Sequence, residues 1–243
     1  MVGENGAGKS TLGKILAGIF PHDEGEIWID GRPVRFTEPR DALRIGIGIV
    51  HQEMVFCENL SVAENLCLGT LPTRGSFVSR RLMDTRARQM LTTIEADIDV
   101  RLPISGLSIG QRQLVQIAAA IGSGARVLIF DEPTSSLSHV EVERLFEQIE
   151  RLKSQGVTTI YISHHLDEIF RLSDHVTVLR DGQHVATTPT RALDEAALIN
   201  LMIGRTLEAY FPVHVQSDPG VEVFRVEDLT SPGKFEHISF TVH

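Results

Sequence analysis

The chain has 243 residues, of which 42% are hydrophobic and 23% are charged, so it can build the hydrophobic core of a large globular domain. Its formal net charge of −9 gives no support for binding to nucleic acid or to an anionic membrane. Two cysteines do not make a disulfide framework, and no apolar stretch approaches the ~20 residues that span a bilayer. We therefore expect a cytosolic protein that reaches a membrane only through a partner.

The chain opens with a glycine-rich segment, called the phosphate loop here. Its residues are Gly3, Glu4, Asn5, Gly6, Ala7, Gly8, Lys9, Ser10 and Thr11, and the first eight fit the pattern G-x-x-x-x-G-K-[ST]. Glycines let backbone N–H groups approach phosphate oxygens, and a helix predicted over 9–17 directs its positive end at the same place. Lys9 would neutralise the β- and γ-phosphates, and the Ser10 hydroxyl would ligate Mg²⁺.

Only Met1 and Val2 precede this loop, although such loops normally follow a buried strand. We expect Val2 to be the last residue of a strand whose beginning lies before Met1. The chain would then be a fragment of a longer protein.

The rest of the chain alternates between strand and helix patterns. Strands are predicted at 26–30, 45–50, 126–130, 157–162, 175–179 and 184–187; helices at 61–68, 80–98, 108–121, 140–153 and 194–203; and a loop at 69–79. The alternation predicts an α/β domain with a mainly parallel sheet, and the helical stretch of about 61–109 reads as an inserted subdomain. Residues 205–220 read as a linker, and 221–243 as two strands that begin another domain.

Polar residues follow three of the predicted strands. Asp131 and Glu132 come directly after 126–130, and carboxylates at the carboxyl end of a parallel strand reach the ligand crevice. Asp131 would hold Mg²⁺ or its waters, and Glu132 would act as general base on the attacking water. His164 follows the next strand and is preferred over His165 as a γ-phosphate sensor. Gln52 follows 45–50 and could ligate Mg²⁺ and orient water.

A second turn that could face an anion is formed by Ser108, Ile109, Gly110 and Gln111, at the start of a predicted helix. Ser108 lies 23 residues before Asp131.

The order of these motifs resembles the nucleotide-binding domain of ABC ATPases over about residues 1–204. The resemblance implies a P-loop NTPase fold with a mainly parallel, RecA-like sheet core and an inserted α-helical subdomain, and it implies ATP and Mg²⁺ as cofactors. It makes 108–111 the signature motif, which closes over the γ-phosphate of ATP held by a facing domain. It makes 136–138 the loop that crosses between the two domains.

A narrower resemblance is to the importers of ribose, galactose, arabinose and xylose, whose ATPase subunit carries two such domains in one chain. It rests on LSIGQRQ, ENLCLGTLPTRGSFVSRRLM, YISHHLDEIF, VTVLRDGQ and MIGRTLEAYFP, and 221–243 is similar to the start of the second domain. Ile109 departs from the general signature, which has Gly there, but resembles the first domain of these importers. The family's aromatic residue that stacks on adenine would lie before Met1, so we expect triphosphate recognition to survive better than selectivity for adenine.

The resemblance implies an ATP-hydrolysing subunit that energises import of a monosaccharide, peripheral on the inner face of the cell membrane. Its partners would be a second ABC domain, in the same full-length chain or another copy, and two membrane permease subunits docked near residues 54–61. A periplasmic or extracellular sugar-binding protein would act indirectly, and no nucleic acid is expected. The alternatives are a soluble ABC ATPase not linked to transport, which the short insert and acidic balance disfavour, and a nucleotide-binding module with little turnover. The sequence does not identify the sugar.

Overall fold

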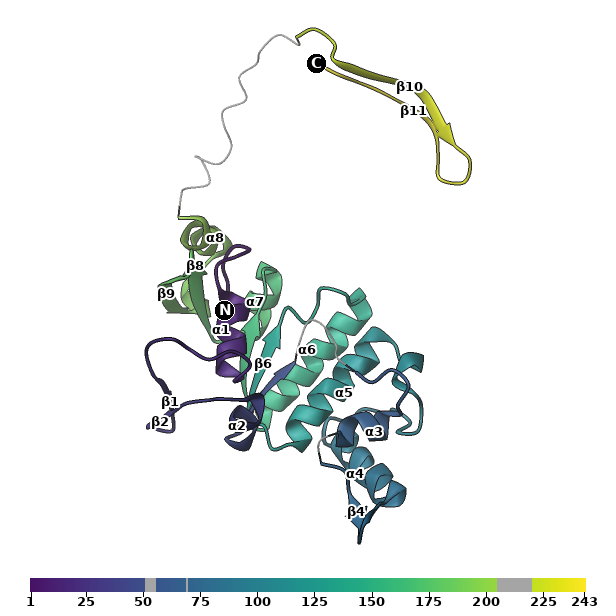
Figure 1. Ribbon diagram of the computed structural model, residues 1–243. Coiled ribbons are helices and arrows are strands. Elements are labelled where there is room, and N and C mark those ends of the chain that lie inside the picture. Colours follow the sequence, from purple (N-terminus) through teal and green to yellow (C-terminus); the bar gives the residue numbers. More distant parts are fainter. Residues whose placement is uncertain (51–55, 69, 205–219) are drawn as a thin grey trace. The chain divides into compact units, whose positions relative to one another are not determined.

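The protein is described here by a computed structural model of residues 1–50, 56–68, 70–204 and 220–243. It consists of two compact units, Met1–Gly204 and Arg205–His243 (Figure 1). The predicted magnesium ligand Gln52 and almost all of the predicted linker lie outside the described residues. That 221–243 begins a second ABC domain stays a prediction.

A parallel sheet forms the centre of the first unit. Strands β3 (Ile47–Val50), β6 (Val127–Asp131) and β7 (Thr158–Ile162) lie in the order β3-β6-β7, with both neighbouring pairs parallel. Successive residues of β6 face opposite sides, so Leu128 and Phe130 join one hydrophobic cluster while Ile129 joins another. The mainly parallel α/β sheet predicted from the sequence is confirmed.

The first two residues occupy a strand position beside this sheet. Val2 forms a parallel bridge with Val178 of β8 (His175–Arg180), and its backbone exchanges hydrogen bonds with Thr177 and Leu179 at 2.9 Å each. On the other side the Met1 amino group donates to the Tyr161 carbonyl of β7 at 2.6 Å. Val2 is completely buried. Met1 and Val2 thus anchor the start of the phosphate loop to β8 on one side and to β7 on the other.

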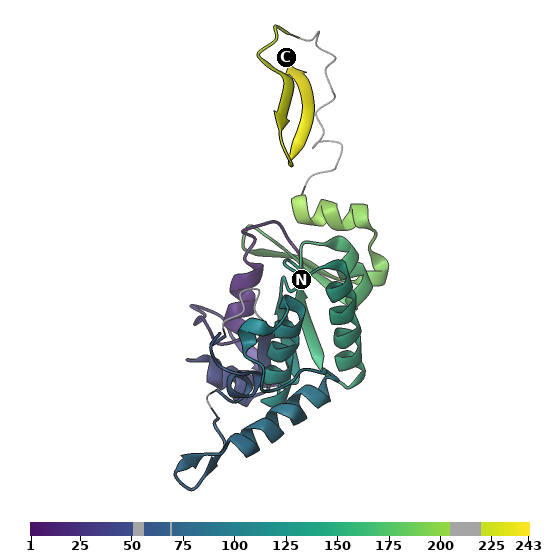
Figure 2. The same ribbon diagram turned by 90° about the vertical axis from the view of Figure 1, so that its right-hand side faces the viewer.

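Helices cover both faces of the sheet (Figures 1 and 2). One face carries α1 (Lys9–Leu16) and α2 (Pro39–Arg44), and the other carries α5 (Ile109–Gly122) and α6 (His139–Ser154). Helix α6 packs its stripe of Leu145, Phe146, Ile149 and Leu152 into the core. The chain continues through α7 (Leu166–Leu172) and ends the unit with β9 (Gln183–Pro189) and α8 (Glu195–Ile203).

Two helices were not predicted from the sequence. Helix α2 has six residues and α7 has seven, too short to show a clear helical period. Capping side chains define α2 instead, because Glu38 and Asp41 form a reciprocal capping box and Pro39 opens the first turn.

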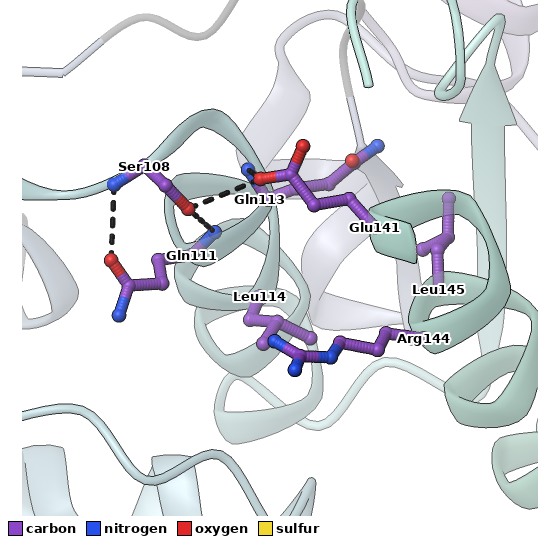
Figure 3. Close-up of a pocket in the computed structure, with 8 residues that line it drawn as sticks. Ser108, Gln111, Gln113, Leu114, Glu141, Arg144 and Leu145 are labelled. Carbon is purple, nitrogen blue, oxygen red and sulfur yellow. Dashed lines mark hydrogen bonds between the residues drawn. The ribbon is translucent and has the colours of Figure 1, made fainter. Parts of the chain in front are cut away.

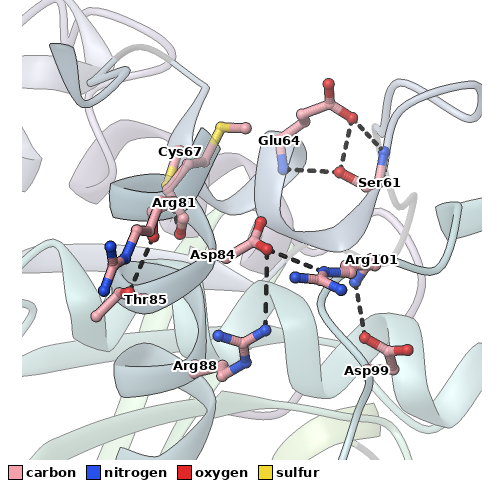
Figure 4. A network of polar contacts seen from close by, with 10 residues as sticks. Ser61, Glu64, Cys67, Arg81, Asp84, Thr85, Arg88, Asp99 and Arg101 are labelled. Carbon is pink, nitrogen blue, oxygen red and sulfur yellow. Dashed lines mark hydrogen bonds and ion pairs between the residues drawn. The ribbon is translucent and has the colours of Figure 1, made fainter. Parts of the chain in front are cut away.

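The stretch predicted to be an inserted subdomain contains two α-helices at the predicted places, α3 (Val62–Cys67) and α4 (Arg80–Thr93). Ser61 and Glu64 form a reciprocal capping box at the start of α3, and Asp84 of α4 pairs with both Arg88 and Arg101 (Figure 4). These contacts fix the start of α3 and link α4 to the segment that follows it.

Two predictions for this subdomain are wrong. The stretch 69–79 was expected to be loop, but β4 (Thr73–Arg74) pairs with β5 (Phe77–Val78) in a small hairpin that turns at Gly75, where φ is 64°. The helix expected over 80–98 ends at Thr93, because Glu95 adopts a left-handed backbone with φ of 52° that stops helix propagation.

Two antiparallel hairpins complete the description. In the first unit β1 (Ile27–Ile29) pairs with β2 (Arg32–Val34) around Gly31. In the second unit, where two strands were predicted, β10 (Phe224–Ser231) pairs with β11 (Phe235–Val242). Across the described ranges we find no helix long and apolar enough to cross a membrane.

Candidate nucleotide-binding site

The phosphate loop wraps around the Lys9 side chain. Lys9 is buried, and its ammonium donates to the carbonyls of Gly3 at 2.9 Å and Glu4 at 3.0 Å. An ammonium has three protons, so one donor remains for an anion.

The loop ends at the N-terminus of α1. Gly8 is the N-cap residue, with φ of 92°, and it has no side chain to accept hydrogen bonds from the first turn. The N–H groups of that turn therefore stay available for an anion, and the helix dipole favours negative charge there.

The hydroxyl of Ser10 joins this loop to the central sheet. Its Oγ donates to Oδ1 of Asp131 at 2.8 Å. Asp131 is the last residue of β6 and is 95% buried, with 5% of its surface exposed. The two residues predicted to hold Mg²⁺ thus lie in contact although 121 positions separate them. Hydroxyl and carboxylate oxygens are hard ligands of the kind that Mg²⁺ prefers, so the donor set fits this ion.

Glu132 and His164 also come together at this edge of the sheet. Nδ1 of His164 lies 3.2 Å from Oε1 of Glu132. Glu132 has φ of 46°, a conformation that non-glycine residues rarely adopt, and its N–H donates to the Ile162 carbonyl at 2.9 Å. His165 packs its ring on that of His164, with centroids 4.2 Å apart, and it does not share the contact with Glu132 among the described interactions.

The segment 163–165, called the histidine turn here, is supported by a buried carboxylate that was not predicted from the sequence. Glu168 accepts from the Tyr161 hydroxyl at 2.9 Å and from the Ser163 hydroxyl at 2.6 Å. Burial and the neighbouring Glu168 charge raise the pKa of the Tyr161 phenol well above its usual range, so this hydroxyl keeps its proton and donates. An acid four residues after His164 gives no sequence signal of burial by itself, because most such residues are exposed on a helix.

The turn Ser108–Gln111, called the signature turn here, lies at the start of α5. Ser108 caps the helix and forms a reciprocal capping box with Gln111 (Figure 3). Among the described residues, and apart from the backbone bonds within α5, the hydrogen bonds of this turn go to its own members and to Glu141 and Arg112, and none goes to the phosphate loop.

Glu141 is a second residue that sequence reasoning missed. One of its oxygens accepts from Ser108 and Gly110 (Figure 3). The other oxygen accepts from Ser138. These bonds, led by those from Ser138, lower the pKa of the Glu141 carboxyl below its usual range. The sequence does carry a signal for it, because Ser138-x-x-Glu141 is a capping-box pattern.

Helix α5 is tied to the acidic pair as well. The buried Gln113 side chain donates to the Pro133 carbonyl at 2.8 Å, directly after Glu132. The signature turn and the acids of β6 are therefore connected through one helix.

Comparison with known proteins agrees with this geometry. The family model described as "ABC transporter" matches residues 1–135. The chain is 44% identical to a ribose import ATP-binding protein of Jannaschia sp., over all of this chain and 47% of that protein. It is 42% identical to an arabinose import ATP-binding protein of Chromohalobacter salexigens, over all of this chain and 49% of that protein.

Solved structures give the same fold. An ATP-binding cassette of an ABC transporter matches with a TM-score of 0.70 and 25% identity, covering 87% of this chain and 86% of that one. A dimeric ATP-binding cassette bound to ADP and phosphate matches in fold, with a TM-score of 0.63 and 24% identity, covering 79% and 84% of the two chains.

The chain spans about half the length of the curated relatives described above. The family model covers 135 of its 243 residues, including the phosphate loop, the signature turn and the acidic pair. On this match, and on the fold that carries it, the chain belongs to the ABC transporter family as an ATP-binding domain.

Proposed function

We propose that this chain is an ATP-hydrolysing domain that powers import of a monosaccharide through a membrane permease. The observation that carries the proposal is the convergence of Ser10, Asp131, Glu132 and His164 at one edge of the sheet, next to the phosphate loop. Names of relatives at 41–45% identity, which are ribose, galactose and arabinose import ATP-binding proteins, support the sugar-import part.

The proposed reaction is hydrolysis of the phosphoanhydride bond between the β- and γ-phosphates. The backbone N–H groups of the phosphate loop and the Lys9 ammonium bind the phosphates, and Glu132 accepts a proton from the attacking water. The new bond forms between water oxygen and γ-phosphorus, the bond to the β,γ-bridging oxygen breaks, and ADP leaves. His164, held by Glu132, donates a hydrogen bond to a γ-phosphate oxygen.

Ser10 and Asp131 would hold Mg²⁺, and Gln52 is proposed as a third ligand. The ion would neutralise charge on the β- and γ-phosphates.

Two such domains are proposed to work as a pair, with the second supplied by the same full-length chain or by another copy. The signature turn of one domain then meets ATP on the phosphate loop of the other. A groove lined by residues that include Leu43, Ile49, Phe56, Leu66 and Gln116 supports docking of a permease segment near residues 56–61. Residues 54 and 55 of the proposed docking segment lie outside the described ranges. In this proposal the protein sits on the inner face of the membrane through the permease subunits, and the sugar-binding protein acts indirectly.

Hydrolysis is tested by phosphate release and by binding of a fluorescent ATP analogue to the 243-residue chain. We expect Lys9→Met to weaken binding and Glu132→Gln to keep binding but lower phosphate release by about 100-fold or more. Lys14→Met, at the far end of α1, is the matched control and should change neither quantity. Unchanged turnover in Glu132→Gln would refute the role of Glu132, and a chain that binds no nucleotide would contradict the proposal itself.

A soluble ATPase that does not serve transport is the second candidate. Co-purification of the full-length protein with its permease, and sugar uptake that depends on Glu132, would exclude it. Binding without turnover in every permease-bound sample would instead favour the module with little hydrolysis.

A further inference from the structure

The carboxylate of Glu141 occupies the hydrogen-bond donors of the signature turn. Its Oε1 accepts from the Ser108 hydroxyl at 3.2 Å and from the Gly110 N–H at 3.1 Å (Figure 3). Its Oε2 accepts from the N–H and hydroxyl of Ser138 at 3.0 and 2.8 Å. One side chain therefore links the start of α5 to the start of α6.

These donors can serve only one acceptor each. A serine hydroxyl has a single proton, and Ser108 directs it to Glu141 while its oxygen accepts from Gln111. The Gly110 N–H lies in the first turn of α5, where backbone donors have no partner within the helix. A phosphate oxygen that takes these two protons must displace the carboxylate, and two anions so close also repel one another.

The space around Gly110 shows how closely the carboxylate approaches. A Cβ atom at this position would lie 2.7 Å from Oε1 of Glu141 and 2.9 Å from its Cγ. Any larger residue at position 110 would push Glu141 away. The glycine thus permits the approach of Glu141 itself, in addition to that of a ligand.

We propose that Glu141 is a positioning residue that fills the signature turn and is displaced by the terminal phosphate of ATP bound to a facing domain. This proposal rests on the proposed function, in which the signature turn meets that phosphate. Displacement of Glu141 would also change the structure of a neighbouring loop. Because the same carboxylate caps Ser138, its displacement alters the crossing loop 136–138 when the facing site is filled.

The first test asks whether Glu141 occupies the turn, without using nucleotide. Backbone amide exchange of the 243-residue chain, followed by NMR, should show faster exchange at Gly110 and Ser138 in Glu141→Ala than in the wild type. Glu147→Ala, at an exposed position on the same helix, is the control and should leave both amides unchanged. Equal exchange in Glu141→Ala and Glu147→Ala would overturn the proposal.

The second test asks whether the charge opposes ATP across the interface. In a Glu132→Gln background that blocks turnover, Glu141→Gln keeps the shape and acceptor oxygen but removes the charge. We expect it to self-associate at roughly two- to five-fold lower ATP concentration in sedimentation experiments, the range for one charge pair at a half-exposed site. Binding of a fluorescent ATP analogue to the monomer should not change.

The outcomes distinguish a failure of the displacement proposal from a failure of the proposed function. If Glu141→Gln associates at the same or higher ATP concentration than Glu147→Gln, the displacement proposal fails while the proposed function stands. A chain that binds nucleotide but never associates also overturns it, since no phosphate then reaches the turn. A chain that binds no nucleotide contradicts the proposed function.

Discussion

Nδ1 of His164 lies 3.2 Å from Oε1 of Glu132. The two residues follow neighbouring parallel strands, and the pairing of Asp131 with Ile162 brings the ends of those strands level. The contact orients the imidazole so that its other nitrogen, Nε2, points away from Glu132. Because Nδ1 and Nε2 lie on different sides of the ring, one histidine can contact Glu132 and a phosphate oxygen at once.

We predict that His164→Ala lowers ATP hydrolysis by about 10- to 100-fold, because it removes one hydrogen-bond donor from the γ-phosphate and frees the Glu132 side chain. Phosphate release at saturating ATP measures the effect. His165→Ala is the matched control, since its ring stacks on His164 but has no contact with Glu132 among the described interactions. A larger loss in His165→Ala than in His164→Ala would reverse our assignment.

A second prediction concerns the charge state of Glu141. Hydrogen bonds from Ser138, and after them those from Gly110 and Ser108, hold the pKa of this carboxyl below its usual range. Ser138→Ala should therefore raise the pKa of Glu141 more than Ser108→Ala does, as followed by carboxyl NMR during acid titration.

The lowered pKa of Glu141 also determines how the stability of the fold changes with pH. A carboxyl with a lowered pKa in the folded state stabilises the fold above its unfolded pKa, and that contribution is lost as the pH falls through the folded pKa. The wild type should lose more stability than Glu141→Gln on acidification below about pH 4.5, near the unfolded pKa. An equal loss in both proteins would show that the hydrogen bonds to Glu141 are not formed in solution.

The sequence predicted the parallel sheet because β3, β6 and β7 are short apolar runs separated by helical patterns. It also predicted which polar residues follow β6 and β7, since strand ends of a parallel sheet meet at one edge. The capping-box pattern of Ser61 and Glu64 marked the start of α3 accurately, because it depends on two residues three apart.

The features that could not be predicted from the sequence depend mostly on contacts between segments that are far apart in the chain. Glu168 lies in α7, which the sequence did not predict, and only the packing of α7 against β7 buries it between Tyr161 and Ser163. The reach of Glu141 to Gly110 depends on how α5 and α6 pack together. The hairpin at Thr73–Val78 has strands of two residues each, too short for an alternating pattern.

A third prediction tests the buried network around Glu168. Glu168→Ala leaves the hydroxyls of Tyr161 and Ser163 without their acceptor and should lower the free energy of unfolding by about 2–4 kcal/mol in urea titrations. Glu168→Gln keeps an acceptor oxygen and should recover more than half of the loss. Asp167→Ala, next to it but exposed, should stay within about 1 kcal/mol of the wild type. If Glu168→Ala and Asp167→Ala are equally stable, the network does not support the histidine turn.

The last prediction concerns the first residue of the phosphate loop. A Cβ atom at Gly3 would lie 2.1 Å from the Leu179 carbonyl oxygen, which belongs to a backbone held in place by the hydrogen bond from Leu179 N–H to Val2. Neither partner can move without breaking the anchor of the loop beside β8. Gly3→Ala should therefore lower the free energy of unfolding by about 3 kcal/mol or more, measured by urea titration without nucleotide.

Gly6→Ala provides the comparison. Gly6 also has a positive φ, of 84°, but nothing lies within 4 Å of its Cβ position. Only backbone strain remains, so we expect a loss of about 1 kcal/mol. The two substitutions in one loop thus separate steric conflict from backbone strain. If the Gly3→Ala chain is as stable as the Gly6→Ala chain, Val2 and Leu179 do not pair in solution. The phosphate loop would then lack the strand anchor described above.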